Sequence, residues 1–379
     1  MLYLDNAASS PVRPEVLEAM WPYLSGVFGN PSSHHELGET AARALAAARA
    51  ETAALLGCRP GEIVYTSGGT ESNNLAIKGI ALASPRDRRI VTTPIEHEAV
   101  LESADYLRRL HGFRVELLPV DGTGLVGAED LRARLGGGTT LVSIALANNE
   151  IGTVQPIAAL AALARAAGVP IHTDAVQAAG WLPIRLDELG VDALSISGHK
   201  LGTPKGIGLL AVRSSLPLEP LVHGGGQQRG RRSGTENAAA AVGLATALRL
   251  AEGERAEAAA RVAGLRDAFI AEVLSGVPRA QLTGHPSQRL PALASFCFPG
   301  TSGEAVLLEL ERRGVVCSSG SACAAGSSEP SAVLTALGIE AEVAQTAVRF
   351  SFDRDISADQ LAQAAAAVTA AVAAVSALR

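Results

Sequence analysis

The chain has 379 residues, of which 47% are hydrophobic and 18% charged, and its formal net charge at pH 7 is −6. This length and composition exclude an intrinsically disordered protein and predict a globular one that is large enough for two domains. The arginines are scattered and form no basic stripe, so we expect no direct binding to nucleic acid.

Targeting signals are not evident. The N-terminus has no charged stretch followed by an apolar one, so we expect no signal peptide. The Ala-rich segment 359–379 is too weakly apolar to span a bilayer, and we expect no membrane association. The cysteines show no zinc-type spacing, so we expect no resident metal. Without an export signal we predict a reducing, cytoplasmic location, where disulfides are rare.

From about residue 36 to 215, helical and strand patterns alternate along the chain. The pattern predicts helices over 39–56, 70–83, 98–111 and 157–167. It predicts strands over 63–66, 89–92, 114–118, 141–146, 170–173, 191–196 and 208–212. Strands that are separated by helices of this length indicate an α/β fold, with a mostly parallel sheet covered on both faces.

Beyond residue 215 this alternation stops. A Pro- and Gly-rich loop reaches to about residue 237, and a long helix is predicted over 238–275. Strand-like pieces follow at 294–298, 315–318 and 348–352. We therefore expect a smaller α+β domain, formed by residues 1–14 and 251–379, beside a large domain over 15–250.

Lys200 is the first candidate for chemistry. Only Lys78, Lys200 and Lys205 among the 32 basic residues are lysines, so this chain generally uses arginine where charge alone is needed. A lysine amine can lose its proton and condense with an aldehyde, which a guanidinium cannot do. Lys200 follows a predicted strand, which favours pyridoxal phosphate (PLP) as a cofactor. The alternative is an ordinary surface lysine.

Three other motifs follow predicted strands. Residues 67–72, Ser-Gly-Gly-Thr-Glu-Ser, suit a phosphate at a helix N-terminus, or else are a plain capped helix start. Asp174 could keep a PLP pyridinium protonated, or cap the next helix. His97 could stack on a planar cofactor and exchange protons, although a lone histidine is more often structural.

Cys323 lies within residues 318–328, a run of Ser, Gly, Ala and Cys. Such a run cannot pack a core, so it predicts a mobile loop with an exposed thiol, as a transferable nucleophile requires. Cys317, at the end of a predicted strand, is the competing candidate. Cys58 and Cys297 have apolar neighbours that are typical of inert thiols.

These motifs resemble those of NifS/IscS-type (class I) cysteine desulfurases, of the PLP fold-type I aminotransferase class V family. The resemblance covers nearly the whole chain, in the family's order. The matching segments are 3–8, 29–33, 66–74, 96–97, 148–152, 172–177, 197–200, 232–235, 319–323 and 349–351.

The resemblance implies a large domain with a mostly parallel seven-stranded sheet flanked by helices, a smaller α+β domain, and a homodimer. It implies conversion of L-cysteine to L-alanine, with Lys200 as the Schiff-base lysine, His97 as the acid/base and Cys323 as the sulfur acceptor. The implied cofactor contacts are Gly69, Thr70, Asn149, Asp174, Gln177, Ser197, His199 and, from the other subunit, Thr235. Arg349 would bind the substrate carboxylate, and Asn149 would also contact the substrate.

The implied partner is a sulfur-acceptor protein such as an iron–sulfur scaffold, which makes Cys323 a candidate transient iron–sulfur ligand. Three departures stand out. Thr203 replaces the glycine expected before Pro204, and Cys317 is an additional thiol near the acceptor. The chain also stops at Arg379 without the tail that some members use to hold the scaffold, which puts that partner in doubt. Iron–sulfur assembly, tRNA thiolation and DNA sulfur modification therefore remain open as destinations of the sulfur.

Two kinds of alternative function also remain open. An aminotransferase or a selenocysteine lyase of the same fold would have no need of Cys323. A PLP-binding regulator or sulfur-relay module would bind the cofactor and form no alanine from cysteine.

Overall fold

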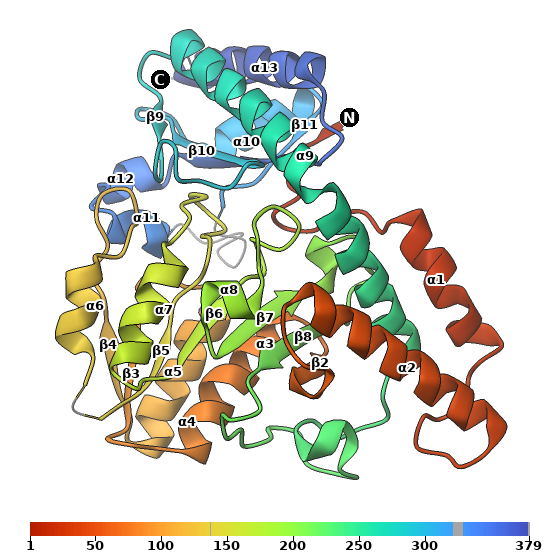
Figure 1. Ribbon diagram of the computed structural model, residues 1–379. Helices are drawn as coiled ribbons and strands as arrows, with labels where there is room; N and C mark the ends of the chain where they lie inside the picture. Colours follow the sequence, from red (N-terminus) through yellow and green to blue (C-terminus); the bar gives the residue numbers. More distant parts are fainter. Residues whose placement is uncertain (137, 321–328, 378–379) are drawn as a thin grey trace.

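A seven-stranded sheet lies at the centre of the larger body of the molecule (Figure 1). The computed structural model describes residues 1–136, 138–320 and 329–377. The strand order is β2-β8-β7-β6-β5-β3-β4, and only β8 runs antiparallel to its neighbours. The strands are β2 (Ile63–Thr66), β3 (Arg89–Thr92), β4 (Arg114–Leu117), β5 (Thr139–Ser143), β6 (Ile171–Asp174), β7 (Ala193–Ser197) and β8 (Gly208–Val212). The predicted α/β class with a mostly parallel sheet is confirmed.

Helices cover both faces of this sheet, and for that reason its strands read as nearly continuous apolar runs. Leu209 and Ala211 pack into one buried cluster, whereas Leu210 and Val212 pack into the cluster on the other face. The covering helices are α2 (Glu36–Leu55), α3 (Gly69–Asn74), α4 (Ile80–Ala83), α5 (Glu98–His111), α6 (Ala128–Arg134), α7 (Ile157–Ala166) and α8 (Leu186–Leu189). A π-helical turn (Leu75–Gly79) joins α3 to α4, so the predicted helix over 70–83 is continuous but not uniform.

A smaller body contains a three-stranded antiparallel sheet in the order β12-β10-β9. Its core is aromatic, and Phe269 lies 5.2 Å from Phe350 and 5.5 Å from Phe352 between ring centroids. The elements are β9 (Gln281–Leu282), β10 (Leu293–Cys297), β11 (Val315–Val316), β12 (Ala347–Ser351), α10 (Gly303–Arg312), α11 (Ala332–Ala336), α12 (Ala341–Ala344) and α13 (Ala358–Ser376).

Helix α9 (Ala238–Gly276) joins the two bodies. Its first part buries Leu244 and Leu248 in the core of the large body, and its second part buries Phe269 and Val273 in the core of the small one. The N-terminal strand β1 (Leu2–Tyr3) pairs with β11 and brings Leu4 into the small core. The domain limits at residues 14 and 250 stay a prediction.

The structure contains helices that the sequence analysis did not predict, among them α6 and α8 of the large body and α1 (Pro14–Ser25), which packs against α9. It also revises the expectation for the C-terminus. By length and composition α13 is apolar enough to cross a membrane, contrary to the expectation for 359–379. Its apolar side chains, including Leu361, Val368 and Val372, instead pack into the small core, so here it is a core helix.

Candidate functional site

A cavity of about 260 Å³ lies at the carboxyl edge of the large sheet. Strands β2, β3, β5, β6 and β7 all end at this edge, because β8 is antiparallel to both β2 and β7. The residues just after them therefore meet there, as expected for a ligand site of an open α/β sheet. Ten predicted site residues line the cavity: Gly69, Thr70, His97, Asn149, Asp174, Gln177, Ser197, His199, Lys200 and Arg349.

Lys200 lies in the short helical turn that follows β7. Its Nζ donates to the carbonyl oxygen of Ala7 and, at 2.7 Å, to that of Ala8. Burial lowers the pKa of Lys200 to about 8, and Arg349 acts in the same direction. The amine therefore loses its proton much closer to neutral pH than an ordinary lysine, as attack on an aldehyde requires.

Asp174 is the last residue of β6, and two donors fix its carboxylate. Asn73 Nδ2 donates to Oδ2 at 2.6 Å, and the Val176 N–H donates to Oδ1 at 2.9 Å. The residues that follow form turns over 176–181 and not a helix, so Asp174 is not a helix cap. An anchored carboxylate at this edge suits a protonated ring nitrogen.

The side of the cavity formed by Gly69, Thr70, Ser197 and His199 suits an anion. A Cβ at Gly69 would lie 2.9 Å from Val176 Cγ2, so the close packing there requires glycine. Burial lowers the pKa of His199 to about 4, which keeps its imidazole neutral. Its buried Nδ1 has no hydrogen-bond partner within the described part of the chain. Backbone N–H groups at the start of α3 add donors.

His97 is both a structural and a candidate catalytic residue. It precedes α5 as its N-cap, and its Nδ1 accepts a 3.0 Å hydrogen bond from the Ala99 N–H. His97 is exposed and lines the cavity, and its other ring nitrogen, Nε2, is left for proton transfer. The adjacent Glu96 is buried and accepts from the Ala145 N–H at 3.0 Å, and burial raises the pKa of Glu96 to about 8.

Arg349 comes from β12 of the small body, and its side chain is only 1% exposed. Its Nη1 donates to the carbonyl oxygen of Asn149 at 2.9 Å and to that of Gly320 at 3.2 Å. Its Nη2 donates to Asp5 Oδ1 at 2.7 Å. Arg349 thus links the small body, the loop after β5 and the N-terminal segment at one point of the cavity.

Sequence reasoning assigned no role to several residues that fix this site. These are Asp5, which pairs with Arg349; Asn73, which holds Asp174; Glu96; and the carbonyls of Ala7 and Ala8. Gln177, which was predicted, also donates to the Ala7 carbonyl at 3.1 Å. All the missed residues lie inside the segments on which the resemblance rests. The motifs therefore mark these residues, but they do not show which of them contact one another.

Of the described site residues that the sequence predicts, Thr235 is not brought into the cavity. Thr235 is exposed and does not line it, although the neighbouring Arg232 pairs with Glu71 of α3 at 2.9 Å. Cys323 lies outside the described residues. Of the described thiols, burial raises the pKa of Cys58 to about 12, that of Cys297 to about 11, and that of Cys317 further, so all three are poor nucleophiles at neutral pH.

The residues of the cavity fit PLP. Lys200 offers an amine of lowered pKa for the aldehyde, and Asp174 offers an anchored carboxylate for the ring nitrogen. The close packing at Gly69 and the unpartnered Nδ1 of His199 provide a cradle and a polar group for the phosphate.

Comparisons with known proteins agree with this arrangement. Residues 2–363 match the family model described as aminotransferase class-V. The chain is 46% identical to a cysteine desulfurase IscS of Dictyoglomus turgidum, over 92% of this chain and 89% of that protein. A solved structure described as a NifS-like protein superimposes with a TM-score of 0.90 at 36% identity, over 97% of this chain and 98% of that one.

A second solved structure is described as SspA in complex with cysteine. It matches with a TM-score of 0.82 at 38% identity, over 93% of this chain and 99% of that one. The chain therefore belongs to the aminotransferase class-V family of PLP-dependent enzymes and is of the NifS/IscS type.

Proposed function

We propose that the protein is a PLP-dependent cysteine desulfurase, which converts L-cysteine to L-alanine and transfers the sulfur as a persulfide to Cys323. One observation carries the proposal. A single cavity joins the amine of Lys200, the anchored carboxylate of Asp174 and the buried guanidinium of Arg349. Support comes from the relatives that bear this name and from the similar structure described with cysteine.

The chain's own residues account for binding and proton movement. Bound PLP supplies an aldehyde and an electron sink. Arg349 binds the substrate carboxylate, because a guanidinium can hold it with two hydrogen bonds. Lys200, with its pKa of about 8, can accept and return a proton near neutral pH, and the Ala7 and Ala8 carbonyls hold its amine when it is not engaged. His97 Nε2 is the second proton-transfer group.

The sulfur step balances with Cys323 as nucleophile. Its thiolate forms a bond to the substrate sulfur while the carbon–sulfur bond of the substrate breaks. The electron pair of the broken bond stays on carbon, which takes up a proton and leaves as alanine. Cys323 then carries the persulfide, and no external oxidant is required.

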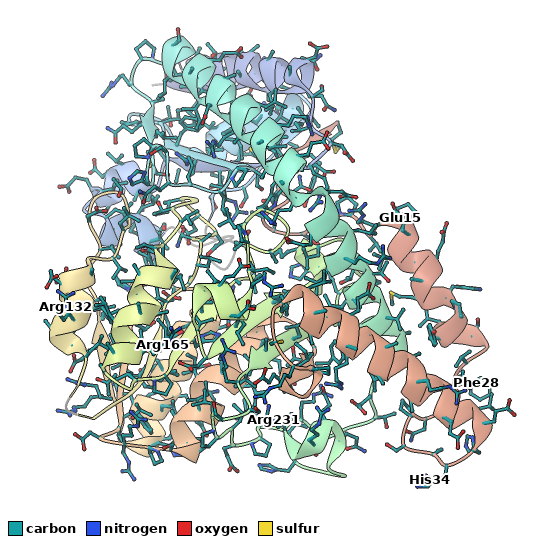
Figure 2. The ribbon with its side chains drawn as sticks, in the orientation of Figure 1. Glu15, Phe28, His34, Arg132, Arg165 and Arg231 are labelled. Carbon is teal, nitrogen blue, oxygen red and sulfur yellow. The ribbon has the colours of Figure 1, made fainter. Side chains whose placement is uncertain are left out.

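We further propose that the protein is a homodimer. Helix α1 exposes Leu17, Trp21 and Leu24, which are 49%, 68% and 58% exposed and are spaced to share one face of the helix. Phe28, 71% exposed, extends this apolar face in the connection between α1 and α2, at the edge of the molecule in Figure 2. Such a face favours a protein partner, and the exposed Thr235 favours a cofactor contact made across the dimer.

The same proposal includes an acceptor protein for the sulfur. We infer a cytoplasmic enzyme that passes its persulfide to an acceptor protein, for iron–sulfur cluster assembly or for thio-cofactor or tRNA biosynthesis. The name IscS of the relatives favours iron–sulfur assembly. Trapping the Cys323 persulfide partner on an affinity-tagged protein would identify the acceptor.

The experiment that tests the activity uses purified protein, loaded with PLP and visibly yellow. It is incubated with L-cysteine and a reductant, and alanine and sulfide are measured. We expect both products in equal amounts. A keto acid in place of alanine would indicate an aminotransferase. Absorbance of the cofactor without any alanine would indicate a module that binds PLP without turnover.

A further inference from the structure

The ion pair between Asp5 and Arg349 carries an inference that goes beyond the proposed activity. The Arg349 side chain is 1% exposed and that of Asp5 is 18% exposed, and their closest atoms are 2.7 Å apart. The two residues are 344 positions apart in sequence. The guanidinium that is proposed to bind the substrate carboxylate therefore already faces a carboxylate of the protein.

The donors of Arg349 can be counted, because a guanidinium has five N–H groups. Nη1 donates to two carbonyl oxygens, those of Asn149 and Gly320, and Nη2 donates to Asp5. Nε is buried and has no partner within the described residues. One N–H on Nε and one on Nη2 are thus left, which is enough for a single carboxylate.

Asp5 acts on Arg349 from outside the cavity. Arg349 lines the cavity, as do Ala7 and Ala8, whereas Asp5 does not. The backbone fixes its position: Leu4 N–H donates to the Val316 carbonyl at 2.8 Å, and Asp5 forms a parallel bridge to Ser351, two residues after Arg349. The backbone pairing therefore holds Asp5 beside the guanidinium.

The guanidinium of Arg349, with its two free N–H groups, is called the Arg349 clamp below. We propose that Asp5 makes this clamp selective for zwitterionic α-amino acids over plain carboxylates. The proposal rests on the proposed function and adds a specificity-determining residue to it. Asp5 is a positioning residue that acts through Arg349 and does not itself touch the substrate.

The physical reason is the charge that the clamp presents. With Asp5 beside it, Arg349 offers hydrogen-bond donors but little net charge. At distances larger than the separation of the pair, the positive charge of Arg349 and the negative charge of Asp5 nearly cancel. A plain carboxylate is attracted by Arg349 and repelled by Asp5. The ammonium group of an amino acid is attracted by Asp5, which offsets that repulsion. The pair thus penalises an anion that lacks the amino group.

The test compares two ligands that differ only in the amino group, L-alanine and propionate. Neither carries a thiol, so neither is desulfurated. The L-alanine amine can also condense with the PLP aldehyde, but this contribution is common to the unaltered protein and the variant and cancels when each ligand is compared between the two proteins. Dissociation constants are measured by titration calorimetry on the full-length, PLP-loaded protein. In Asp5→Asn, which keeps an acceptor for Arg349 but loses the charge, we expect propionate to bind at least about tenfold tighter. The increase in affinity for L-alanine should be clearly smaller than that for propionate.

Unchanged or weaker binding of propionate in Asp5→Asn would overturn the proposal, as would an equal gain for both ligands. Equal losses would mean that Asp5 only holds Arg349 in place. Asp355→Asn is the matched control, since Asp355 is an exposed carboxylate of the small body without a described contact to Arg349. This substitution should leave the dissociation constants of propionate and of L-alanine unchanged.

A measurement on the unaltered protein covers the case in which Asp5→Asn does not fold. Propionate is compared with propionamide, its neutral counterpart. A neutralised clamp should prefer propionate by less than about tenfold, and a much larger preference would overturn the proposal. Failure of the proposed function is seen separately, as the absence of alanine from L-cysteine in the unaltered protein.

Discussion

Asn73 Nδ2 donates a hydrogen bond of 2.6 Å to Asp174 Oδ2, and both residues line the cavity. Asn73 is 2% exposed, so this bond is sheltered from water. It holds the carboxylate that we assign to the cofactor's ring nitrogen. The amide is neutral, so it orients Asp174 without competing with it for a proton.

Replacement of Asn73 by alanine should weaken PLP binding. A hydrogen bond to a charged group contributes about 1.5–3 kcal/mol, which corresponds to a rise of about tenfold or more in the dissociation constant. Asn73→Asp should be worse, because two adjacent carboxylates cannot both stay ionised. Absorbance titration of each unloaded protein with PLP measures the dissociation constant of the cofactor in both variants. Equal affinity of all three proteins, with unchanged melting temperatures, would contradict the role of this bond.

Lys200 should be irreplaceable by arginine. Lys200→Arg keeps the charge but cannot condense with an aldehyde, so we expect no covalently bound PLP and no alanine formation. Lys205→Arg is the matched control, because Lys205 is exposed and does not line the cavity. Its absorbance and activity should equal those of the unaltered protein. An active Lys200→Arg enzyme would exclude the assignment of PLP chemistry to Lys200.

The lowered pKa of Lys200 predicts the pH dependence of cofactor uptake. Only the neutral amine attacks the aldehyde, and with a pKa of about 8 its fraction rises steeply between pH 7 and 9 and then levels off. An ordinary lysine would still be gaining reactivity above pH 10. Stopped-flow absorbance of the unloaded protein mixed with PLP gives this profile. A rate that keeps rising beyond pH 10 would show that burial does not lower the pKa.

The residues at the sheet edge could be predicted from sequence, and the contacts that hold them could not. Asp174 and Lys200 each follow an apolar run, and parallel strands bring such positions to one edge. The pairing of Asp5 with Arg349 depends instead on how β1 docks on β11, about which a local pattern says nothing. Helix α1 was missed because it is apolar on two faces and contains a proline at position 22. Val16 and Met20 are buried whereas Leu17, Trp21 and Leu24 are exposed, so the apolar residues do not mark a single buried face.

The exposed face of α1 predicts that Trp21→Glu weakens the dimer. A central tryptophan commonly contributes at least about 2 kcal/mol to an interface, so the dimer dissociation constant should rise at least about thirtyfold. Sedimentation velocity over a range of concentrations measures it. Leu110→Glu on α5, where Leu110 is 61% exposed, is the matched control and should leave the dimer intact. A Trp21→Glu protein that stays dimeric would place the interface elsewhere.

His172 should make the fold sensitive to acid. It is fully buried between Ser143 Oγ and Ser195 Oγ, each 2.9 Å from a ring nitrogen, and burial lowers the pKa of His172 to about 3. The unfolded chain takes up a proton near pH 6.5, whereas the folded chain does not, so stability is lost as pH falls below 6.5.

The comparison with His172→Gln isolates this effect. Between pH 6.5 and 4, the free energy of unfolding of the unaltered protein should fall by up to about 1.4 kcal/mol per pH unit more steeply than that of the variant. Urea titrations at pH 7, 6 and 5 give the two slopes. Parallel slopes would mean that the buried imidazole takes up its proton as easily as an exposed one.

The cysteines provide the most direct test of the sulfur step. Cys323→Ser should still bind PLP and L-cysteine but form no persulfide, because serine cannot accept the sulfur. Cys317→Ser should keep most of the activity: burial, reinforced by the charge of Asp5, raises the pKa of the Cys317 thiol and leaves almost no thiolate at neutral pH. Mass spectrometry of the protein after a single turnover detects the added sulfur and its position. Persulfide on Cys317 in the unaltered protein, or loss of activity in Cys317→Ser with Cys323→Ser unaffected, would assign the acceptor role to the other thiol.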